Sequence, residues 1–511
     1  MRPFQEFRLW ARRAPVSERV GAVAGAAVVL AALLFLVSPG SQSNPASANS
    51  APGRTGGNSS AAGSNGASSS GTSTAGTAAG SASASGGGGT AGGSPGAAGS
   101  AGGGATSAAA AGCPSGSDQG VSATQLRIAI TLVNIFGPAA NNAFGIPTTT
   151  QQEAIFNTII SSVNASGGIC GRKIVPVYFQ ANPADPTQTQ QVCLQVVQAG
   201  VFAVLDPGSY SQTSPLCFSQ NQIPYFGGYI LTEQQQNQGY PYLFDLGSWD
   251  HLLKDTVFGF QSRGEFNQVN GFKKLGIFYH DCHPELINEE LGWLQQAGVQ
   301  SSQIVTYDFG CPTAFANPND VQEAILKFES SGVNDVTDVN AEGDWSEFTN
   351  TAQGQGFHPQ YLIPDEELLG ISGGADAPNS SNLANALAVT ASRNGENDTP
   401  GITPTPGTQK CNAIMQSGGL PPVYQQEQLA GDACNEIWML QAAVQHAPVL
   451  QRNALAAGIQ AAGSVDFSYP GGPNDFSGDH VTTAGEFWRV DQFFETCTCW
   501  RVIDPTFHPN Y

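Results

Sequence analysis

The sequence predicts an α/β fold with two doubly wound, Rossmann-like lobes joined by a hinge, preceded by a membrane segment and a disordered linker. After Cys113, short apolar runs alternate with amphipathic segments, a pattern typical of parallel strands connected by helices. The alternation starts again near Lys274, which indicates a second lobe. Residues 113–511 are therefore expected to form one bilobed domain, with lobe 1 at about 121–250, lobe 2 at about 270–370, and later segments crossing between the lobes.

The first lobe is expected to contain a parallel sheet flanked by helices. Ile155, Ile159 and Val163 recur at four-residue spacing, which predicts a buried helix face within residues 148–163. A second amphipathic helix is expected over 185–199. The strands of this sheet are expected at the apolar runs 126–132, 173–179, 201–205, 224–226 and 242–244.

The second lobe repeats the same order of elements. Its strands are expected at 274–279, 304–309, 333–339 and 360–364, and its helices at 285–297, 319–330 and 345–353. The region 370–422 is rich in Gly, Pro, Asn and Ser and predicts loops with one helix near 382–390. A long helix is expected over 423–446, followed by a short antiparallel ribbon of residues 486–490 and 499–503.

The first 37 residues resemble an export segment. Residues 1–19 carry five arginines against two glutamates, and residues 20–37 are uncharged and apolar. Eighteen residues at 1.5 Å each span about 27 Å, close to the ~30 Å of a membrane core. The basic residues predict a cytoplasmic N-terminus and a single-pass anchor in the cell membrane, with the domain outside. The alternative is a cleaved signal and a secreted protein, because Ala46-Ser47-Ala48 offers a processing site.

Residues 38–112 are almost wholly Gly, Ala, Ser, Thr, Asn and Pro, with Arg54 as the one charge. Such a segment buries too little apolar surface to offset its ordering entropy, so a disordered linker is expected. Its root-mean-square reach as a flexible coil would be about 48 Å.

The remaining domain is strongly acidic. It holds 13 of the 19 basic and 38 of the 40 acidic residues, a net charge of −25. Proteins bind nucleic acids largely through lysine and arginine side chains that neutralise phosphates. Because this domain is strongly acidic, nucleic acid is excluded as a partner.

All ten cysteines lie after residue 112, which is typical of an oxidising compartment. Cys193 and Cys217 are expected to pair because helices after neighbouring strands lie side by side on one face of a doubly wound sheet. Cys282 is expected to pair with Cys311, because each ends one of two adjacent strands. Cys411 is expected to pair with Cys434, its near neighbour in the chain. Cys113 with Cys170, and Cys497 with Cys499, remain by elimination. A zinc site of His280, Cys282 and His283 is the alternative at the second pair.

Four segments carry a family resemblance: SATQLRIAI (122–130), VNASGGICGRKIV (163–175), DPTQTQQVCLQVVQAGVFAVLDPGSYS (185–211) and GFKKLGIFY (271–279). They resemble type I periplasmic-binding-protein-like domains, and more closely the leucine/isoleucine/valine-type substrate-binding proteins of ABC transporters. The resemblance covers residues 121–300 well, extends to about 365, and is weak beyond. It implies a small-molecule ligand held between the lobes, an ABC permease as partner, and no cofactor.

Ligands of α/β folds bind at the carboxyl ends of the strands, where helix N-termini also point. In this chain the positions that follow strand ends are Asn134, Phe136, Ser209, Tyr210, Ser211, Tyr229, Ser248, Trp249, Asp281, Glu342 and Asp344. Ser209 and Ser211 could receive a carboxylate. The chain differs from amino-acid-binding members at 282–285, where it reads CHPE instead of a Tyr-Gly pair.

Each of these residues also has a structural interpretation. Ser209 and Ser211 could instead cap a helix without contacting a ligand. Tyr229 and Trp249 could pack in the hinge or the core. Glu342 and Asp344 could instead stabilise a helix N-terminus through the helix dipole, without contacting a ligand.

The sequence predicts a binding protein rather than an enzyme. It contains neither a G-x-S-x-G elbow nor an H-E-x-x-H pair, and no phosphate-binding glycine loop. The alternative to a transport role is an extracellular sensor, although the 19 residues before the apolar segment are too few for a signalling domain.

Overall fold

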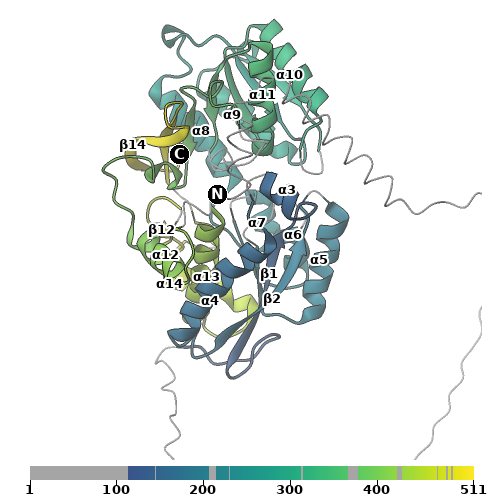
Figure 1. Ribbon diagram of the computed structural model, residues 1–511, viewed down its shortest axis with the longest axis vertical. Helices are drawn as coiled ribbons and strands as arrows, with labels where there is room; N and C mark the ends of the chain where they lie inside the picture. Colours follow the sequence, from purple (N-terminus) through teal and green to yellow (C-terminus); the bar gives the residue numbers. More distant parts are fainter. Residues whose placement is uncertain are drawn as a thin grey trace, which may run out of the picture. The chain divides into compact units, whose positions relative to one another are not determined.

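The computed structural model describes two sheets with helices on both faces (Figure 1). The residues described are 113–143, 146–183, 185–206, 214–228, 231–311, 315–365, 378–422, 428–468, 470–478, 481–484 and 487–511. They belong to one unit of the chain. The expected membrane segment and linker lie outside these residues. Among the described helices, none is both long enough and apolar enough to cross a membrane.

The first lobe is built on a five-stranded parallel sheet in the order β2-β1-β3-β4-β5. Its strands are β1 (Gln125–Val133), β2 (Lys173–Ala181), β3 (Ala203–Asp206), β4 (Tyr225–Gly227) and β5 (Leu243–Phe244). The central strands are buried on both faces, as expected for a parallel sheet covered by helices.

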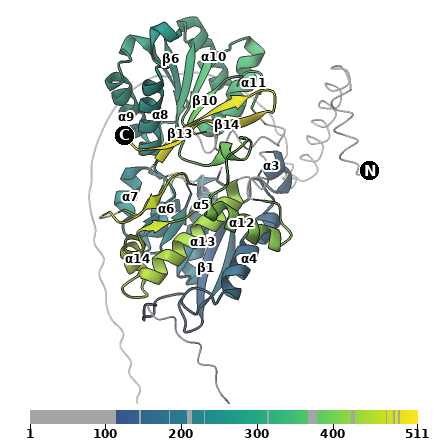
Figure 2. The ribbon, with the colours of Figure 1, turned by 90° about the vertical axis from the view of Figure 1, so that its left-hand side faces the viewer.

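Two groups of helices cover this sheet. One face is covered by α4 (Thr149–Ala165), α12 (Pro406–Ser417) and α13 (Gln428–His446), with α14 (Leu455–Ala462) against α13. The other is covered by α5 (Pro186–Ala199) and α6 (Ser214–Gln220), followed by α7 (Glu233–Gly239) (Figure 2). A short ribbon of β11 (Ser464–Val465) and β12 (Asn474–Asp475) lies beside α13. Helix α3 (Pro138–Ala143) follows β1.

The second lobe contains a seven-stranded sheet in the order β14-β13-β10-β9-β8-β6-β7. The parallel strands are β6 (Leu275–Tyr279), β7 (Ile304–Asp308), β8 (Asp335–Val339), β9 (Gln360–Ile363) and β10 (Leu387–Thr390). The antiparallel strands β13 (Phe487–Phe494) and β14 (Cys499–Pro509) extend one edge. Helices α8 (Trp249–Arg263) and α9 (Pro284–Gln296) cover one face, and α10 (Pro318–Ser331) and α11 (Trp345–Gln355) the other.

The strands and helices predicted up to residue 365 are present, together with α3, α6, α7 and α8, for which no bounds were predicted. Beyond residue 365 the long helix α13 and the antiparallel pair β13 and β14 are as expected, but two elements differ. The helix near 382–390 is wrong, because residues 387–390 form β10 in the interior of the second sheet. All four of its residues are buried, and a short apolar run of this kind has no period that separates strand from helix. Helix α12 was missed, although Thr405 caps it and Pro406 begins it.

The chain crosses between the lobes between β5 and α8, between β10 and α12, and between β12 and β13. The first and last crossings lie side by side: the Asp245 N–H donates to the Thr482 carbonyl (3.1 Å), and the Ala484 N–H to the Asp245 carbonyl (3.0 Å). An isolated bridge also joins Ser392 to Pro470. These adjacent crossings connect the two lobes, where a hinge is expected.

The structure contains the five disulfides that the cysteine positions predict, and no cysteine is free. Cys193 on α5 pairs with Cys217 on α6, and Cys411 on α12 pairs with Cys434 on α13. Cys282 pairs with Cys311, so it is not available as a zinc ligand. The described residues also contain no group of three or more side chains placed to hold a metal ion.

Candidate ligand-binding site

The carboxyl edge of the first sheet is turned toward the second lobe. Helix α3 follows directly after β1, and both Figure 1 and Figure 2 show it on the side of the first lobe that is nearest to the second. Because β1 to β5 are parallel, all five strands end on this side. This is the edge where a parallel sheet usually binds its ligand.

The loop after β1 presents an aromatic ring to solvent. Phe136 is 80% exposed and has a φ of 54°, a left-handed conformation that a bulky residue rarely adopts. Asn134 fixes the turn: its Oδ1 accepts from the Gly137 N–H (2.9 Å), and its Nδ2 donates to Gln180 Oε1 (2.8 Å). Such strained positions are frequent at functional sites.

The predicted residues at the start of α8 are buried. The Ser248 hydroxyl donates to Asp250 Oδ2 (3.4 Å), and Trp249 is 6% exposed within the apolar core formed with α9. The structure therefore favours packing as the role of Trp249. Ser209, Tyr210, Ser211 and Tyr229 lie outside the described residues.

At the carboxyl edge of the second sheet, a polar cluster surrounds His280. His280 Nε2 lies 2.7 Å from Asp344 Oδ2, and Asp344 Oδ1 accepts from the Ala316 N–H (2.8 Å). The Asp338 carboxyl group belongs to the same cluster and accepts from the Ala341 N–H (3.0 Å). Asp344 is thus held by neighbours, whereas Asp281 is exposed.

Glu342 is the member of this group with unused hydrogen-bonding capacity. It lies in a single 3-10 turn, Glu342–Asp344, that precedes α11. Its Oε1 is buried without a hydrogen-bond partner among the described residues. Burial, and then the nearby Asp338 carboxyl, raise the pKa of Glu342 well above its usual range. Burial also raises the pKa of Asp338, to about 7.

A second acidic group, which the sequence analysis missed, lies at the edge of the first sheet. Asp206 is the last residue of β3 and Asp245 follows β5, while Asp432 and Glu436 lie one turn apart on α13. All four are buried, with exposures of 6%, 0%, 6% and 0%. We call them the first-lobe carboxyl cluster. Two sequence features could have indicated this cluster. One is an acidic residue at the end of an apolar run, and the other is a D-x-x-x-E spacing inside an apolar helix.

Burial dominates the protonation of this cluster. It raises the pKa of Asp432 to about 8 and that of Asp245 well above the usual range. Burial raises the pKa of Glu436 strongly too, with further contributions from the charges of Asp432, Asp206 and Asp245. Burial therefore disfavours the ionised forms of Asp245, Asp432 and Glu436.

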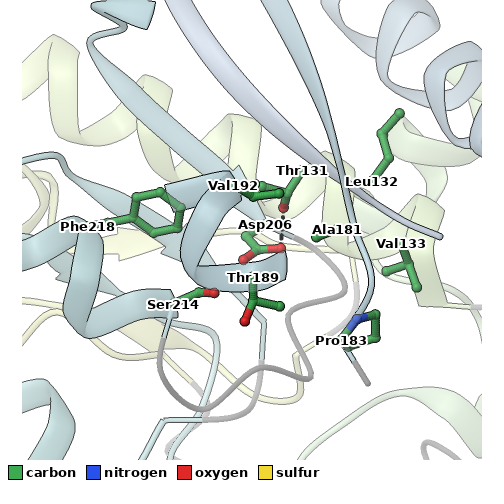
Figure 3. Close-up of a pocket in the computed structure, with 10 residues that line it drawn as sticks. All are labelled: Thr131, Leu132, Val133, Ala181, Pro183, Thr189, Val192, Asp206, Ser214 and Phe218. Atoms are coloured by element: carbon green, nitrogen blue, oxygen red, sulfur yellow. Dashed lines mark hydrogen bonds between the residues drawn. The ribbon is translucent and has the colours of Figure 1, made fainter. Parts of the chain in front are cut away.

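A small cavity opens beside Asp206 on the α5 and α6 side of the sheet edge (Figure 3). Its volume of about 10 Å³ corresponds to one water-sized group. The Thr131 hydroxyl donates to Asp206 within it. The lining residues are Thr131, Leu132, Val133, Ala181, Pro183, Thr189, Val192, Asp206, Ser214 and Phe218.

A larger cavity of about 510 Å³ lies between α7, α8 and α9. Its lining is entirely acidic or amide: Glu233, Gln234, Asn237, Gln238, Asp250, Glu285 and Glu289. His251 Nε2 lies 2.8 Å from Glu233 Oε1. Burial, and then the Asp250 charge, raise the pKa of Glu289 to about 7. The cavity is open and acidic, unlike the mostly apolar pockets that usually bind small organic molecules.

A family model described as "Periplasmic binding protein" matches residues 144–491. The chain belongs to the periplasmic binding protein family. The match extends beyond residue 365, where the motif resemblance is weak. A comparison of this periplasmic binding protein with curated protein sequences finds no match.

Solved structures of the same fold share little sequence with this periplasmic binding protein. A type 1 periplasmic binding protein from Bordetella pertussis is 13% identical, with 75% of this chain and 100% of that chain covered and a TM-score of 0.55. A branched-chain amino acid transporter substrate binding protein from Streptococcus pneumoniae, in complex with isoleucine, is 14% identical, with coverages of 75% and 100% and a TM-score of 0.54.

A third structure binds a different kind of compound. The solute binding protein of an ABC transporter from Rhodopseudomonas palustris, in complex with 3,4-dihydroxy benzoic acid, is 12% identical, with coverages of 76% and 97% and a TM-score of 0.54. At such identities the likeness concerns the fold alone. The ligands of these structures differ, so the fold does not fix the solute.

Proposed function

We propose that this protein binds a small solute, an amino acid or a related compound, outside the cytoplasm and delivers it to an ABC-type permease. The observation that carries the proposal is the gathering of polar groups at the carboxyl ends of the parallel strands in both sheets. Asp206 and Asp245 lie buried at the first edge, and His280 and Asp338 lie buried at the second, beside the half-buried Glu342. Burying a polar group costs free energy unless the group forms hydrogen bonds within the protein or to a ligand.

The hinge supports binding by closure of the two lobes. Three chain crossings, two of them hydrogen-bonded side by side at Asp245, allow the lobes to rotate about a narrow connection. The contacts proposed for the solute come from the loop after β1 (Asn134, Phe136), from Ser209, Tyr210, Ser211 and Tyr229, and from Asp281 and Glu342 in the second lobe. Ser248 and Asp344 are proposed to position these contacts.

The N-terminal segments fit delivery at a membrane. Residues 20–37 are proposed to hold the protein at the membrane, or to direct its secretion if they are cleaved, while residues 38–112 let the domain reach the permease. The presence of ABC transporter proteins among similar folds supports this partner. N-terminal sequencing of the mature protein tests the anchor: a mature N-terminus near Asn49 would show that the segment is a cleaved signal.

The binding proposal is tested by thermal shift of the full chain against amino acids, amides, short peptides and aromatic acids. A solute at 100 times its Kd should stabilise the folded protein by about 2.7 kcal/mol, which raises Tm measurably. If no compound class raises Tm, the proposal of solute binding is wrong. Uptake of the identified solute by cells with and without the protein then separates transport from sensing, because a sensor would leave uptake unchanged.

A further inference from the structure

The turn of the β13–β14 hairpin contains a disulfide that closes a very short loop. Cys497 and Cys499 are bonded with a sequence separation of 2, whereas the other four bridges have separations of 23 to 57. Cys497 lies in the turn after β13, and Cys499 is the first residue of β14 (Figure 2). A bridge across so short a loop removes little entropy from the unfolded chain, so folding in turn protects it little against reduction.

The hairpin is held together without this bridge. Phe494 and Cys499 are paired residues of the two strands, and the Cys497 N–H donates to the Phe494 carbonyl (3.3 Å). Next to the turn, the rings of Phe493 and Trp500 are buried and lie 5.4 Å apart between centroids. Backbone hydrogen bonds and core packing therefore maintain the turn, and opening the bridge would leave the fold in place.

The residue between the two cysteines has a strained backbone. Thr498 has a φ of 53°, in the left-handed region that a β-branched residue rarely adopts. Its N–H donates to the Glu495 carbonyl (3.2 Å), which holds it in this conformation. Backbone outliers of this kind cluster at functional sites, because they persist only where the surrounding structure enforces them.

The Cys497 sulfur belongs to an exposed residue. Of the ten cysteines, only Cys311 and Cys497 are exposed, and the bridges from α5 and α13 each include a fully buried cysteine. Access decides which sulfur of a disulfide a thiolate attacks. Cys499 is half-buried, so Cys497 is the sulfur open to attack and Cys499 is the leaving group.

We propose that the Cys497–Cys499 bridge is a thiol–disulfide exchange site, whose co-substrate is a thiol of a small molecule or of another protein. A thiolate attacks the Cys497 sulfur and forms a mixed disulfide, while the electron pair of the broken bond leaves on the Cys499 sulfur, which takes up a proton. A second thiolate attacks the sulfur of the bound thiol, and the Cys497 sulfur leaves and is protonated. Two thiols are thus oxidised to one disulfide, and the bridge is reduced by two electrons to two thiols.

The test exposes the folded full chain to increasing concentrations of reduced thiol, followed by alkylation and peptide mass spectrometry. The Cys497–Cys499 bridge should open with an equilibrium constant at least about 10-fold larger than that of any other bridge. Cys282–Cys311 is the matched control within the same molecule, because Cys311 is also exposed but the separation is 29. If Cys282–Cys311 opens at the same thiol concentration, or a lower one, the proposal is wrong.

Two reductants distinguish the sources of the thiol. Reduced glutathione represents a small thiol, and reduced thioredoxin represents a protein thiol. Opening of the Cys497–Cys499 bridge by either one supports the exchange site and identifies the kind of co-substrate. A bridge that neither reductant opens overturns the proposal.

Three variants test the order of attack and the role of the bridge. Cys499→Ser should form a mixed disulfide with oxidised glutathione at least about 10-fold faster than Cys497→Ser, because only the first retains the exposed sulfur. Equal rates would contradict the assigned order. The double variant Cys497→Ser/Cys499→Ser should melt within about 2 °C of the parent protein. A larger loss, or failure to fold, would show that the bridge is structural and would overturn the proposal. None of these measurements requires a solute, so their outcome is independent of the proposed solute binding.

Discussion

Replacing Asp335 by asparagine should make the second lobe more stable at alkaline pH. Asp335 begins β8, is 5% exposed, and its Oδ2 has no hydrogen-bond partner among the described residues. Burial, and secondly the nearby Glu265, raise the pKa of Asp335 to about 7. In the unfolded chain an aspartate has a pKa of about 3.9.

The sign of the effect follows from proton binding. Between pH 4 and pH 7 the folded protein keeps this proton and the unfolded chain loses it, so stability falls as the pH rises. The loss is about 1.4 kcal/mol per pH unit, up to about 4 kcal/mol at pH 8 as an upper limit. Asparagine cannot ionise, so the variant should match the parent near pH 4 and exceed it at pH 8.

Urea denaturation followed by circular dichroism at pH 4.5 and pH 8 measures this difference. Other acids titrate in the same range, but they do so equally in both proteins and cancel in the comparison. Glu329→Gln, exposed on α10, is the control and should give the same small offset at both pH values. A stability difference for Asp335→Asn that does not change with pH would refute the argument from burial.

Three further outcomes follow from the structure. Removing the Cys193–Cys217 bridge by a double alanine replacement, which opens a loop with a separation of 24 residues, should lower the free energy of unfolding by about 3 kcal/mol in denaturant titrations. Trp249→Ala should lower it by about 3 to 5 kcal/mol, because the ring is packed in the core of α8 and α9; an unchanged Tm would restore Trp249 as a ligand contact. Phe136→Asn should keep stability within about 0.5 kcal/mol, since the ring is exposed, yet weaken solute binding in calorimetry.

Much of the fold could be predicted because its signals are local. Buried parallel strands such as β3 are continuous apolar runs, and α4 shows its buried face through the spacing of Ile155 and Ile159. Even the Cys193–Cys217 bridge followed from the order of strands and helices. The prediction failed at β10, where four buried residues carry no period, and at α12, whose polar sequence hid a capped helix.

The first-lobe carboxyl cluster could not be predicted for a different reason. Asp206 and Asp245 come together through the strand order β3-β4-β5, but Asp432 and Glu436 reach them from a helix of a much later segment. No local sequence pattern indicates that α13 packs on β3 and β4. The acidic residues can be read from the sequence, whereas their spatial proximity depends on the tertiary structure.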